Sequence, residues 1–202
     1  MVVLGLTGPS GAGKAVVGEV FRARGIPVLD TDKVYHLFIS GPSRCTAELK
    51  EAFGDDIVRA DGGIDRPALA AIVFSGDENE EANKARLNAI THRYVIEACE
   101  KWLREQEETG VKAAVVDAPL LIESKLHKRC DYVIAVLAPR EVRSARIMMR
   151  DGISYASANA RISAQPEDDF YKEHAQFVFH NERAIEDARA FVNNLLTSIS
   201  LT

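Results

Sequence analysis

The residues with the clearest chemical meaning form the stretch Gly8-Pro9-Ser10-Gly11-Ala12-Gly13-Lys14, near the start of the chain. Its glycines let the backbone curl so that several N–H groups point at one anion, and Lys14 adds a full positive charge. A helix beginning at this point would contribute its own N-terminal N–H groups and dipole. Because the spacing G-x-x-x-x-G-K lies between an apolar run and a helical pattern, it predicts a phosphate-binding loop.

The residue after the lysine departs from this pattern. Loops of this kind normally supply a Ser or Thr hydroxyl to Mg²⁺ there, and Ala15 has no ligating atom. Either the metal is held by water and carboxylates, or the loop binds phosphate with reduced catalytic power. Mg²⁺ commonly keeps several waters and needs only one or two carboxylates besides substrate phosphates, so the first alternative is physically reasonable.

Carboxylates follow two of the predicted strands. Asp30 and Asp32 come after the short apolar segment 26–29, and Asp117 ends the apolar run 113–116. Open parallel sheets bind ligands at the C-terminal ends of their strands. Beside a phosphate loop, an Asp can ligate Mg²⁺ through water or accept the proton of an attacking hydroxyl. The alternatives are that Asp30 or Asp32 caps the next helix and that Asp117 is a turn residue.

A group of arginines follows the predicted strand 132–137. Helical spacing places four of them along one stripe: Arg140, Arg143, Arg146 and Arg150. Two further basic residues, Arg161 and Lys172, follow later in the sequence. Such a stripe is usually a solvated face. On an acidic chain with a phosphate loop, it instead favours a mobile lid whose arginines stabilise the charge of a transferring phosphoryl group.

The elements that must position these residues alternate between strands and helices. Apolar runs predict five strands at about 2–6, 26–30, 113–117, 132–137 and 176–181. Residues 33–110 show no convincing buried strand, and apolar spacing predicts one long amphipathic helix near 80–108. His92 lies within that helix and by itself would be a structural residue. The pattern predicts a three-layer α/β fold with a five-stranded parallel sheet and a helical insertion.

Composition limits the classes of protein. The chain has 202 residues, a formal net charge of −5 and three scattered cysteines. It should form one globular unit, without a disulfide framework and without the basic surface of a general nucleic-acid binder. No apolar run reaches membrane length, and the first strand begins at Val2, which leaves no room for a signal peptide. We therefore expect a cytoplasmic protein with neither a nucleic-acid nor a membrane partner.

Taken together, the residues resemble those of the dephospho-coenzyme A kinase family, over nearly the whole chain. The resemblance rests on ordered motifs: the loop Gly8 to Lys14; Val28-Leu29-Asp30-Thr31-Asp32; Gly63-Ile64-Asp65-Arg66 with Leu69 and Phe74; Leu87-Asn88 with His92; Asp117-Ala118-Pro119-Leu120-Leu121 with Glu123; Arg146 with Arg150-Asp151; Arg161-Ile162 with Gln165; and Asn181.

This resemblance implies a P-loop kinase that transfers the γ-phosphate of ATP, with Mg²⁺, to the ribose 3′-hydroxyl of dephospho-coenzyme A. It implies Asp32 as the base, Lys14 on the β- and γ-phosphates and Arg146 on the transferring phosphoryl group. Asp117 would organise the metal through water. The nucleotide would contact Gly8, Pro9, Ser10, Gly11, Ala12, Gly13, Lys14, Ala15, Val16, Arg150 and Asn181, and the acceptor Asp32, His92, Pro119, Leu120, Leu121, Glu123 and Arg161.

The resemblance also implies a division of the single kinase domain 1–202. Residues 1–32, 111–138 and 174–202 would form the nucleotide-binding core, residues 33–110 the acceptor-binding region and residues 139–173 the lid. The chain departs from the family's usual residues at Ala15, at Pro9-Ser10 and at Phe179-His180. The rival hypotheses are another small-molecule kinase of the same architecture and a nucleotide-binding protein without turnover. We expect a monomer or a weak homo-oligomer.

Overall fold

The computed structural model describes residues 1–182 and 185–201. Its strands are β1 (Val2–Thr7), β2 (Val28–Asp30), β3 (Ala113–Asp117), β4 (Tyr132–Leu137) and β5 (Phe177–His180). Its helices are α1 (Lys14–Ala23), α2 (Thr31–Ile39), α3 (Arg44–Phe53), α4 (Arg66–Val73), α5 (Glu80–Glu108), α6 (Arg140–Asp151), α7 (Tyr155–Ser163), α8 (Asp168–His174) and α9 (Ile185–Ser198). Two short 3-10 helices are η1 (Asp55–Ile57) and η2 (Leu126–Arg129).

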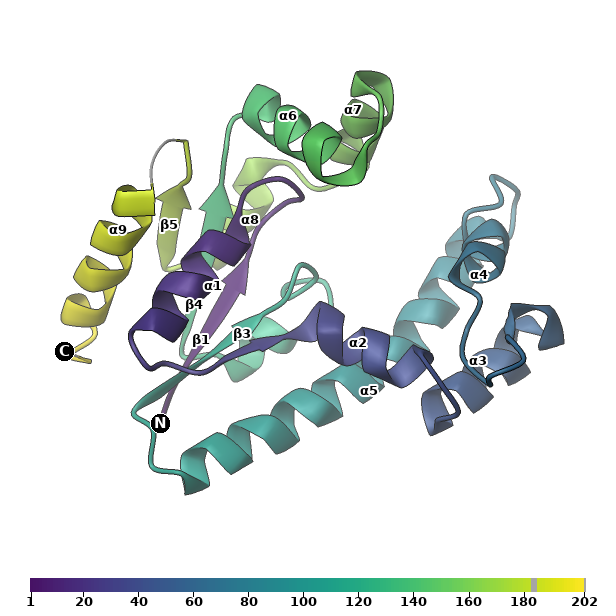
Figure 1. Ribbon diagram of the computed structural model, residues 1–202, viewed down its shortest axis with the longest axis horizontal. Helices are drawn as coiled ribbons and strands as arrows, with labels where there is room; N and C mark the ends of the chain where they lie inside the picture. Colours follow the sequence, from purple (N-terminus) through teal and green to yellow (C-terminus); the bar gives the residue numbers. More distant parts are fainter. Residues whose placement is uncertain (183–184, 202) are drawn as a thin grey trace. The chain divides into compact units, whose positions relative to one another are not determined.

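The five strands form one parallel sheet in the order β2-β3-β1-β4-β5 (Figure 1). The central strand β1 pairs with β3 on one side, Leu6 opposite Asp117, and with β4 on the other, Thr7 opposite Ala135. Parallel strands buried on both faces read as continuous apolar runs, as β3 and β4 do. The predicted fold class is confirmed.

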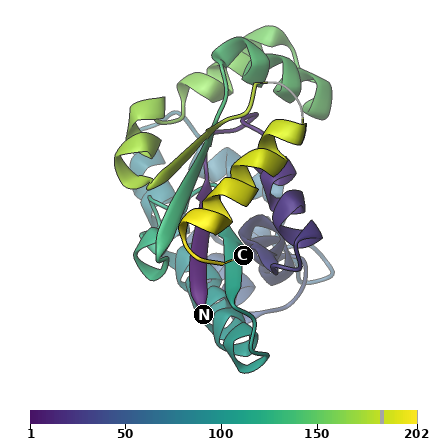
Figure 2. The same ribbon diagram turned by 90° about the vertical axis from the view of Figure 1, so that its left-hand side faces the viewer.

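The contacts divide the chain into two compact units. The first unit joins Met1–Asp30 to Leu103–Thr202 and contains the sheet, and the second is Thr31–Trp102. In the first unit, Leu4 and Leu6 of β1 and Ile134 of β4 share one apolar cluster with residues of α1 and α9 on one face of the sheet. Figures 1 and 2 show the ribbons of these two helices beside the sheet. Alternate residues of β4 point to the other face, where Leu137 packs with Tyr171 of α8. The sheet is therefore covered on both sides.

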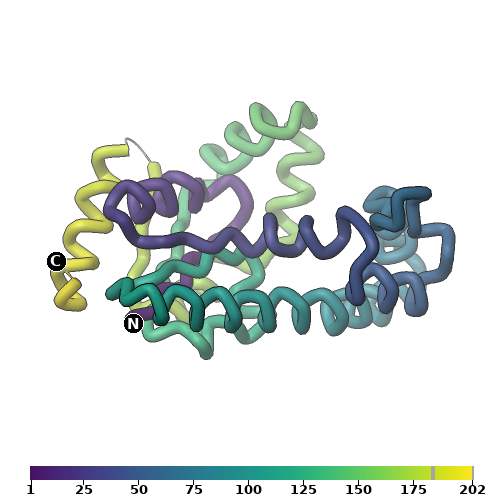
Figure 3. The backbone as a smooth tube through the Cα atoms, turned by 60° about the horizontal axis from the view of Figure 1, so that its bottom comes forward, coloured from purple at the N-terminus to yellow at the C-terminus, as the bar shows by residue number. Residues whose placement is uncertain are grey.

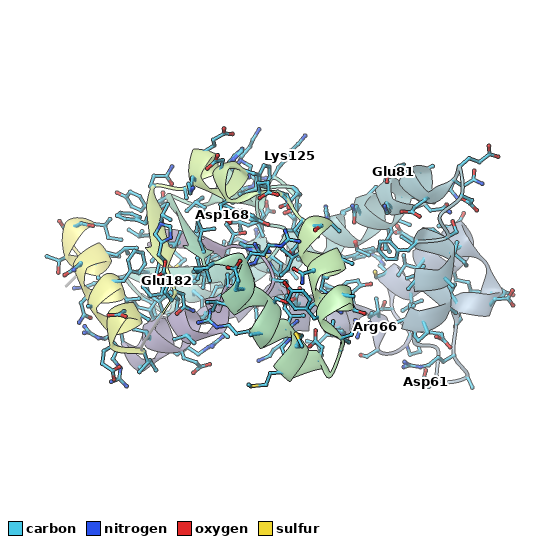
Figure 4. All side chains as sticks on the ribbon, turned by 90° about the horizontal axis from the view of Figure 1, so that it is seen from above. Asp61, Arg66, Glu81, Lys125, Asp168 and Glu182 are labelled. Atoms are coloured by element: carbon cyan, nitrogen blue, oxygen red, sulfur yellow. The ribbon has the colours of Figure 1, made fainter. Side chains whose placement is uncertain are left out.

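The second unit has a helical core of its own. Buried residues of α2, α3, η1 and α4 form one apolar cluster, against which the half-buried Leu87, Ile90 and Tyr94 of α5 pack. Glu48 of α3 accepts a hydrogen bond from Tyr94 Oη at 2.6 Å and pairs with Arg93. Asp61, Arg66 and Glu81, labelled in Figure 4, belong to this unit. The insertion thus folds around its own core.

The longest element is α5, which has 29 residues. Figure 3 traces it as one continuous helix, and its bounds confirm the helix predicted near 80–108. Within the described residues, no helix combines the length and the apolar character that crossing a membrane requires.

Candidate active site

The loop between β1 and α1 has the geometry that its glycines predict. Gly8, Gly11 and Gly13 have φ of +143°, +79° and +90°, which L-residues rarely adopt. A Cβ at Gly8 would lie 2.1 Å from the Val136 carbonyl oxygen, and one at Gly13 would lie 2.1 Å from Asn181 Nδ2. Glycine is therefore required at both positions, because the loop lies directly against β4 and the end of β5.

The same loop suits an anion. Helix α1 begins at Lys14 directly after it, and the first turn of a helix has N–H groups with no acceptor inside the helix. That turn contains no acidic residue to repel a phosphate. Lys14 Nζ donates to the Gly8 carbonyl at 3.1 Å, which folds its side chain back along the loop. The residues present therefore fit the phosphates of a nucleotide.

Arg146 and Asn181 hold the middle of the loop. Arg146 Nη1 donates to the carbonyls of Gly11 (3.3 Å) and Ala12 (3.2 Å), and its Nη2 donates to the Asn181 carbonyl at 3.1 Å. The buried Asn181 side chain donates from Nδ2 to the Ala12 carbonyl at 2.8 Å. The structure thus brings to the loop Arg146 and Asn181, which lie 134 and 169 positions from Ala12 in the sequence.

Two further residues contact the loop, and sequence reasoning assigned neither of them individually to the site. Arg143 and Gln165 both bond to the main chain of Ser10. Gln165 was present in a family motif, and Arg143 was one of four arginines at helical spacing. That spacing indicates a shared side of α6, yet it cannot indicate which arginine is buried. In the structure Arg143 is only 5% exposed, so the solvated-face alternative does not hold for it.

The predicted carboxylates end neighbouring strands. Asp117 at the end of β3 lies in register with Leu6 of β1 and with Asp30, the last residue of β2. It is half-buried at the edge of the sheet from which the phosphate loop leaves. Asp32 lies two residues beyond Asp30, exposed in the first turn of α2, and belongs to the second unit.

The donor set around the loop is compatible with Mg²⁺ held mainly by phosphate and water. Ala15 is exposed and offers no oxygen in its side chain. Among the described residues, no three His, Cys, Asp or Glu side chains converge into a metal cage. Mg²⁺ rarely uses an all-protein cage and suits one carboxylate, water and substrate phosphates. Asp117 is therefore the carboxylate we expect to orient the metal.

Two of the remaining predicted arginines, Arg150 and Arg161, contact an acidic residue on the same segment. Arg150 donates to both oxygens of Asp151, at 2.7 and 2.9 Å, and Arg161 pairs with the same carboxylate. The hydrogen bond from Arg150, and then that from Arg161, lowers the pKa of Asp151 to about 2. Arg140 donates to Asn159 and Ser163 instead. The four arginines of α6 therefore divide between two that bond to the loop and two that bond within residues 140–163.

The segment after β3 contains both packing and surface residues. The Pro119 carbonyl accepts a hydrogen bond from Thr7 Oγ1 at 3.3 Å, and Leu120 is 47% exposed. Leu121 is fully buried, and the absence of a side chain on Gly5 makes room for it. Partial desolvation raises the pKa of Glu123, and His174 and His127 lower it in part.

His92 lies in the second unit, on the part of α5 that packs there. Its Nε2 atom is buried, and the described residues offer it no hydrogen-bond partner. Burial lowers the pKa of this imidazole, so the neutral form is favoured at neutral pH. A buried ring nitrogen without a partner costs free energy unless another group bonds to it, which suits a ligand contact.

Comparison with known proteins agrees with this geometry. A family model described as dephospho-CoA kinase matches residues 2–187. The chain belongs to this family. A dephospho-CoA kinase from Corynebacterium glutamicum is 36% identical over 199 residues, which cover 98% of each chain.

Solved structures lead to the same fold. The crystal structure of TT1252 from Thermus thermophilus matches with a TM-score of 0.77 and 30% identity, covering 98% of this chain and 97% of that one. The dephospho-CoA kinase from Campylobacter jejuni matches with a TM-score of 0.69 and 24% identity, covering 98% and 96%. The parallel sheet with its loop after β1 is therefore the P-loop kinase fold.

Proposed function

We propose that this chain transfers the γ-phosphate of ATP to the ribose 3′-hydroxyl of dephospho-coenzyme A, giving ADP and coenzyme A, the last step of coenzyme A synthesis. The observation that carries the proposal is the phosphate loop bound by Arg146 and Asn181, with Lys14 folded along it, in a chain of this family. The reaction makes the enzyme an ATP-dependent phosphotransferase with an alcohol acceptor.

In this mechanism the loop and Lys14 bind the β- and γ-phosphates. Asp32 accepts the proton of the 3′-hydroxyl while the hydroxyl oxygen bonds to the γ-phosphorus, and the bond from that phosphorus to the β–γ bridging oxygen breaks. Arg146 stabilises the negative charge on the transferring group. When bound, Mg²⁺ neutralises charge on the phosphates, and Asp117 would orient it through water.

Other residues are assigned to the two substrates. His92, Pro119, Leu120, Leu121 and Glu123 contribute to the acceptor site, where the buried ring nitrogen of His92 supports a polar contact. Arg150 and Arg161 act from the lid, residues 139–173, which excludes water while the phosphoryl group transfers. Residues 33–110 form the acceptor-binding region, and residues 1–32, 111–138 and 174–202 form the nucleotide-binding core.

We place the enzyme in the cytoplasm as a monomer or weak homo-oligomer. Burial raises the pKa of the Cys45 thiol to about 11 and that of Cys99 to about 12, which keeps both protonated and unreactive. Buried thiols of this kind suit a reducing compartment. The formal net charge of −5 argues against a general nucleic-acid partner, which would need a basic surface.

The test is release of ADP from ATP and Mg²⁺ with and without dephospho-coenzyme A, the product being identified by mass and by its 3′-phosphate resonance. We expect release that depends on the acceptor, and a loss of at least a hundredfold in Asp32→Asn and Lys14→Ala. The exposed Asp56→Asn and Lys128→Ala are matched controls and should keep full activity. ATP binding without release would favour the non-catalytic hypothesis, and release with a nucleoside or shikimate-like alcohol would favour a different acceptor.

A further inference from the structure

Ser10 of the phosphate loop is enclosed in a ring of three hydrogen bonds. Its N–H donates to Gln165 Oε1 at 3.0 Å, and its carbonyl accepts from Arg143 Nε at 3.0 Å. Arg143 Nη2 donates to the same Gln165 Oε1, also at 3.0 Å, and closes the ring. One amide oxygen therefore serves both the loop and the arginine, so that losing either side chain opens the ring.

Arg143 is almost fully buried, which is unfavourable for a charged side chain. Only 5% of it is exposed, and no ion pair joins it to a carboxylate within the described part of the chain. Burial lowers the pKa of this guanidinium, whereas the negative charge of Asp168, labelled in Figure 4, acts in the opposite direction. A buried cation without an ion pair is costly, so its hydrogen bonds must fix it in place.

The loop also lies against the backbone of α6 at this residue. A Cβ at Gly11 would lie 2.7 Å from the Arg143 carbonyl oxygen and 2.9 Å from its Cα. Ser10 is thus fixed by Arg143 of α6 and by Gln165, which lies two residues after α7. The next two residues of the loop, Gly11 and Ala12, are fixed by Arg146 and Asn181. The two sets of contacts hold different parts of one glycine-rich loop.

We propose that Arg143 and Gln165 are positioning residues that hold the phosphate loop in the conformation that binds the phosphates of ATP. The proposal rests on the function proposed above. Three glycines give the loop many conformations, and fixing both polar groups of Ser10 removes most of them before ATP arrives. Because both side chains come from residues 139–173, they also tie the loop to the segment assigned as the lid.

The experiment compares Gln165→Leu and Arg143→Met with Arg140→Met. Arg140 lies on the same helix and bonds to Asn159 and Ser163, so its removal perturbs α6 and α7 without touching the loop. Calorimetric titration with ATP, in the absence of acceptor, should show the Kd raised about tenfold in the first two variants and less than twofold in the control. The double variant should lose no more than either single one, because each opens the same ring.

Two readouts separate positioning from general stability. The Ser10 amide resonance should move in Gln165→Leu and in Arg143→Met but stay in place in Arg140→Met. KM for ATP should rise while KM for dephospho-coenzyme A changes less than twofold. An ATP Kd within twofold of the parent in both loop variants, or an equal rise in Arg140→Met, would overturn the proposal.

The design remains decisive if one variant does not fold or if the acceptor is wrong. Gln165 is only half-buried, so Gln165→Leu carries the test should Arg143→Met unfold. The binding of ATP is measured without an acceptor. If the parent protein is inactive but binds ATP, and the two loop variants still weaken that binding as expected, the proposed reaction is refuted and the positioning role stands.

Discussion

Replacing Gly13 by Ala tests how closely the end of β5 holds the phosphate loop. Gly13 has φ of +90°, and a Cβ there would lie 2.1 Å from Asn181 Nδ2. Gly25, at the other end of α1, has φ of +74°, and a Cβ there meets nothing within 4 Å. Gly13→Ala and Gly25→Ala therefore share the backbone strain, and only the first also has the steric clash.

The magnitudes follow from these two terms. A positive φ destabilises the folded state by about 1–2 kcal/mol for an L-residue. Alanine also lowers the conformational entropy of the unfolded chain, which offsets about 0.4–1 kcal/mol of that cost. Gly25→Ala should therefore lower the free energy of unfolding by about 1 kcal/mol. In Gly13→Ala the amide of Asn181 must also move off the Ala12 carbonyl, which it contacts at 2.8 Å. Breaking a buried hydrogen bond costs about 1–3 kcal/mol more, or about 3–9 °C in melting temperature for a chain of this size.

Urea unfolding and calorimetric titration with ATP measure both consequences. Gly13→Ala should be the less stable variant and should bind ATP at least about tenfold more weakly, because the loop shifts. Gly25→Ala should bind ATP normally. The double variant Gly13→Ala/Asn181→Ala lacks the atom that causes the clash. It should therefore lose less stability than the two single variants lose together. Equal stability and equal ATP affinity of the two glycine variants would refute the reasoning.

Two further predictions concern Asp151 and Ala15. Asp151 has a pKa of about 2, below the ordinary Asp value, so its pairing stabilises the fold above pH 4 and is lost as the pH falls from 4 to 2. A carbon-detected NMR titration should find its midpoint near 2 and find it higher in Arg150→Gln; an unchanged midpoint would exclude Arg150 as the cause. Ala15→Ser should lower the Mg²⁺ concentration needed for half-maximal turnover, because it adds the missing hydroxyl. Unaltered Mg²⁺ dependence and turnover would show that Ala15 is neutral.

The fold could be predicted almost completely, for reasons that particular residues make clear. Runs such as Val133 to Leu137 are apolar without interruption because the strand is buried on both faces. The loop was recognisable because its glycines adopt angles, and accept contacts, that few other residues tolerate. Helix α5 followed from one apolar spacing continued over many turns. These are local patterns, and they suffice where local patterns decide the structure.

The site was predictable only in part, because its geometry depends on burial and on distant partners. Helical spacing grouped Arg143 with Arg140, yet only the structure shows that one bonds to Ser10 and the other to Asn159. Gln165 lies 155 residues from Ser10 in sequence, and no periodicity links them. Asp32 and His92 stay predictions as site residues, since both belong to the second unit.

The order of the strands has a consequence for how the protein emerges from the ribosome. β1 is synthesised well before its two neighbours, β3 and β4, which begin at Ala113 and Tyr132. At ordinary rates of translation, the apolar residues of β1 therefore wait on the order of ten seconds for their pairing partners. Arg143, Arg146, Gln165 and Asn181 follow later still. A nascent chain that stops before β4 carries every residue of the phosphate loop but lacks the four side chains that bond to it from later in the sequence. Such a chain leaves the β4-facing edge of the apolar strand β1 unpaired, which is a natural target for a chaperone.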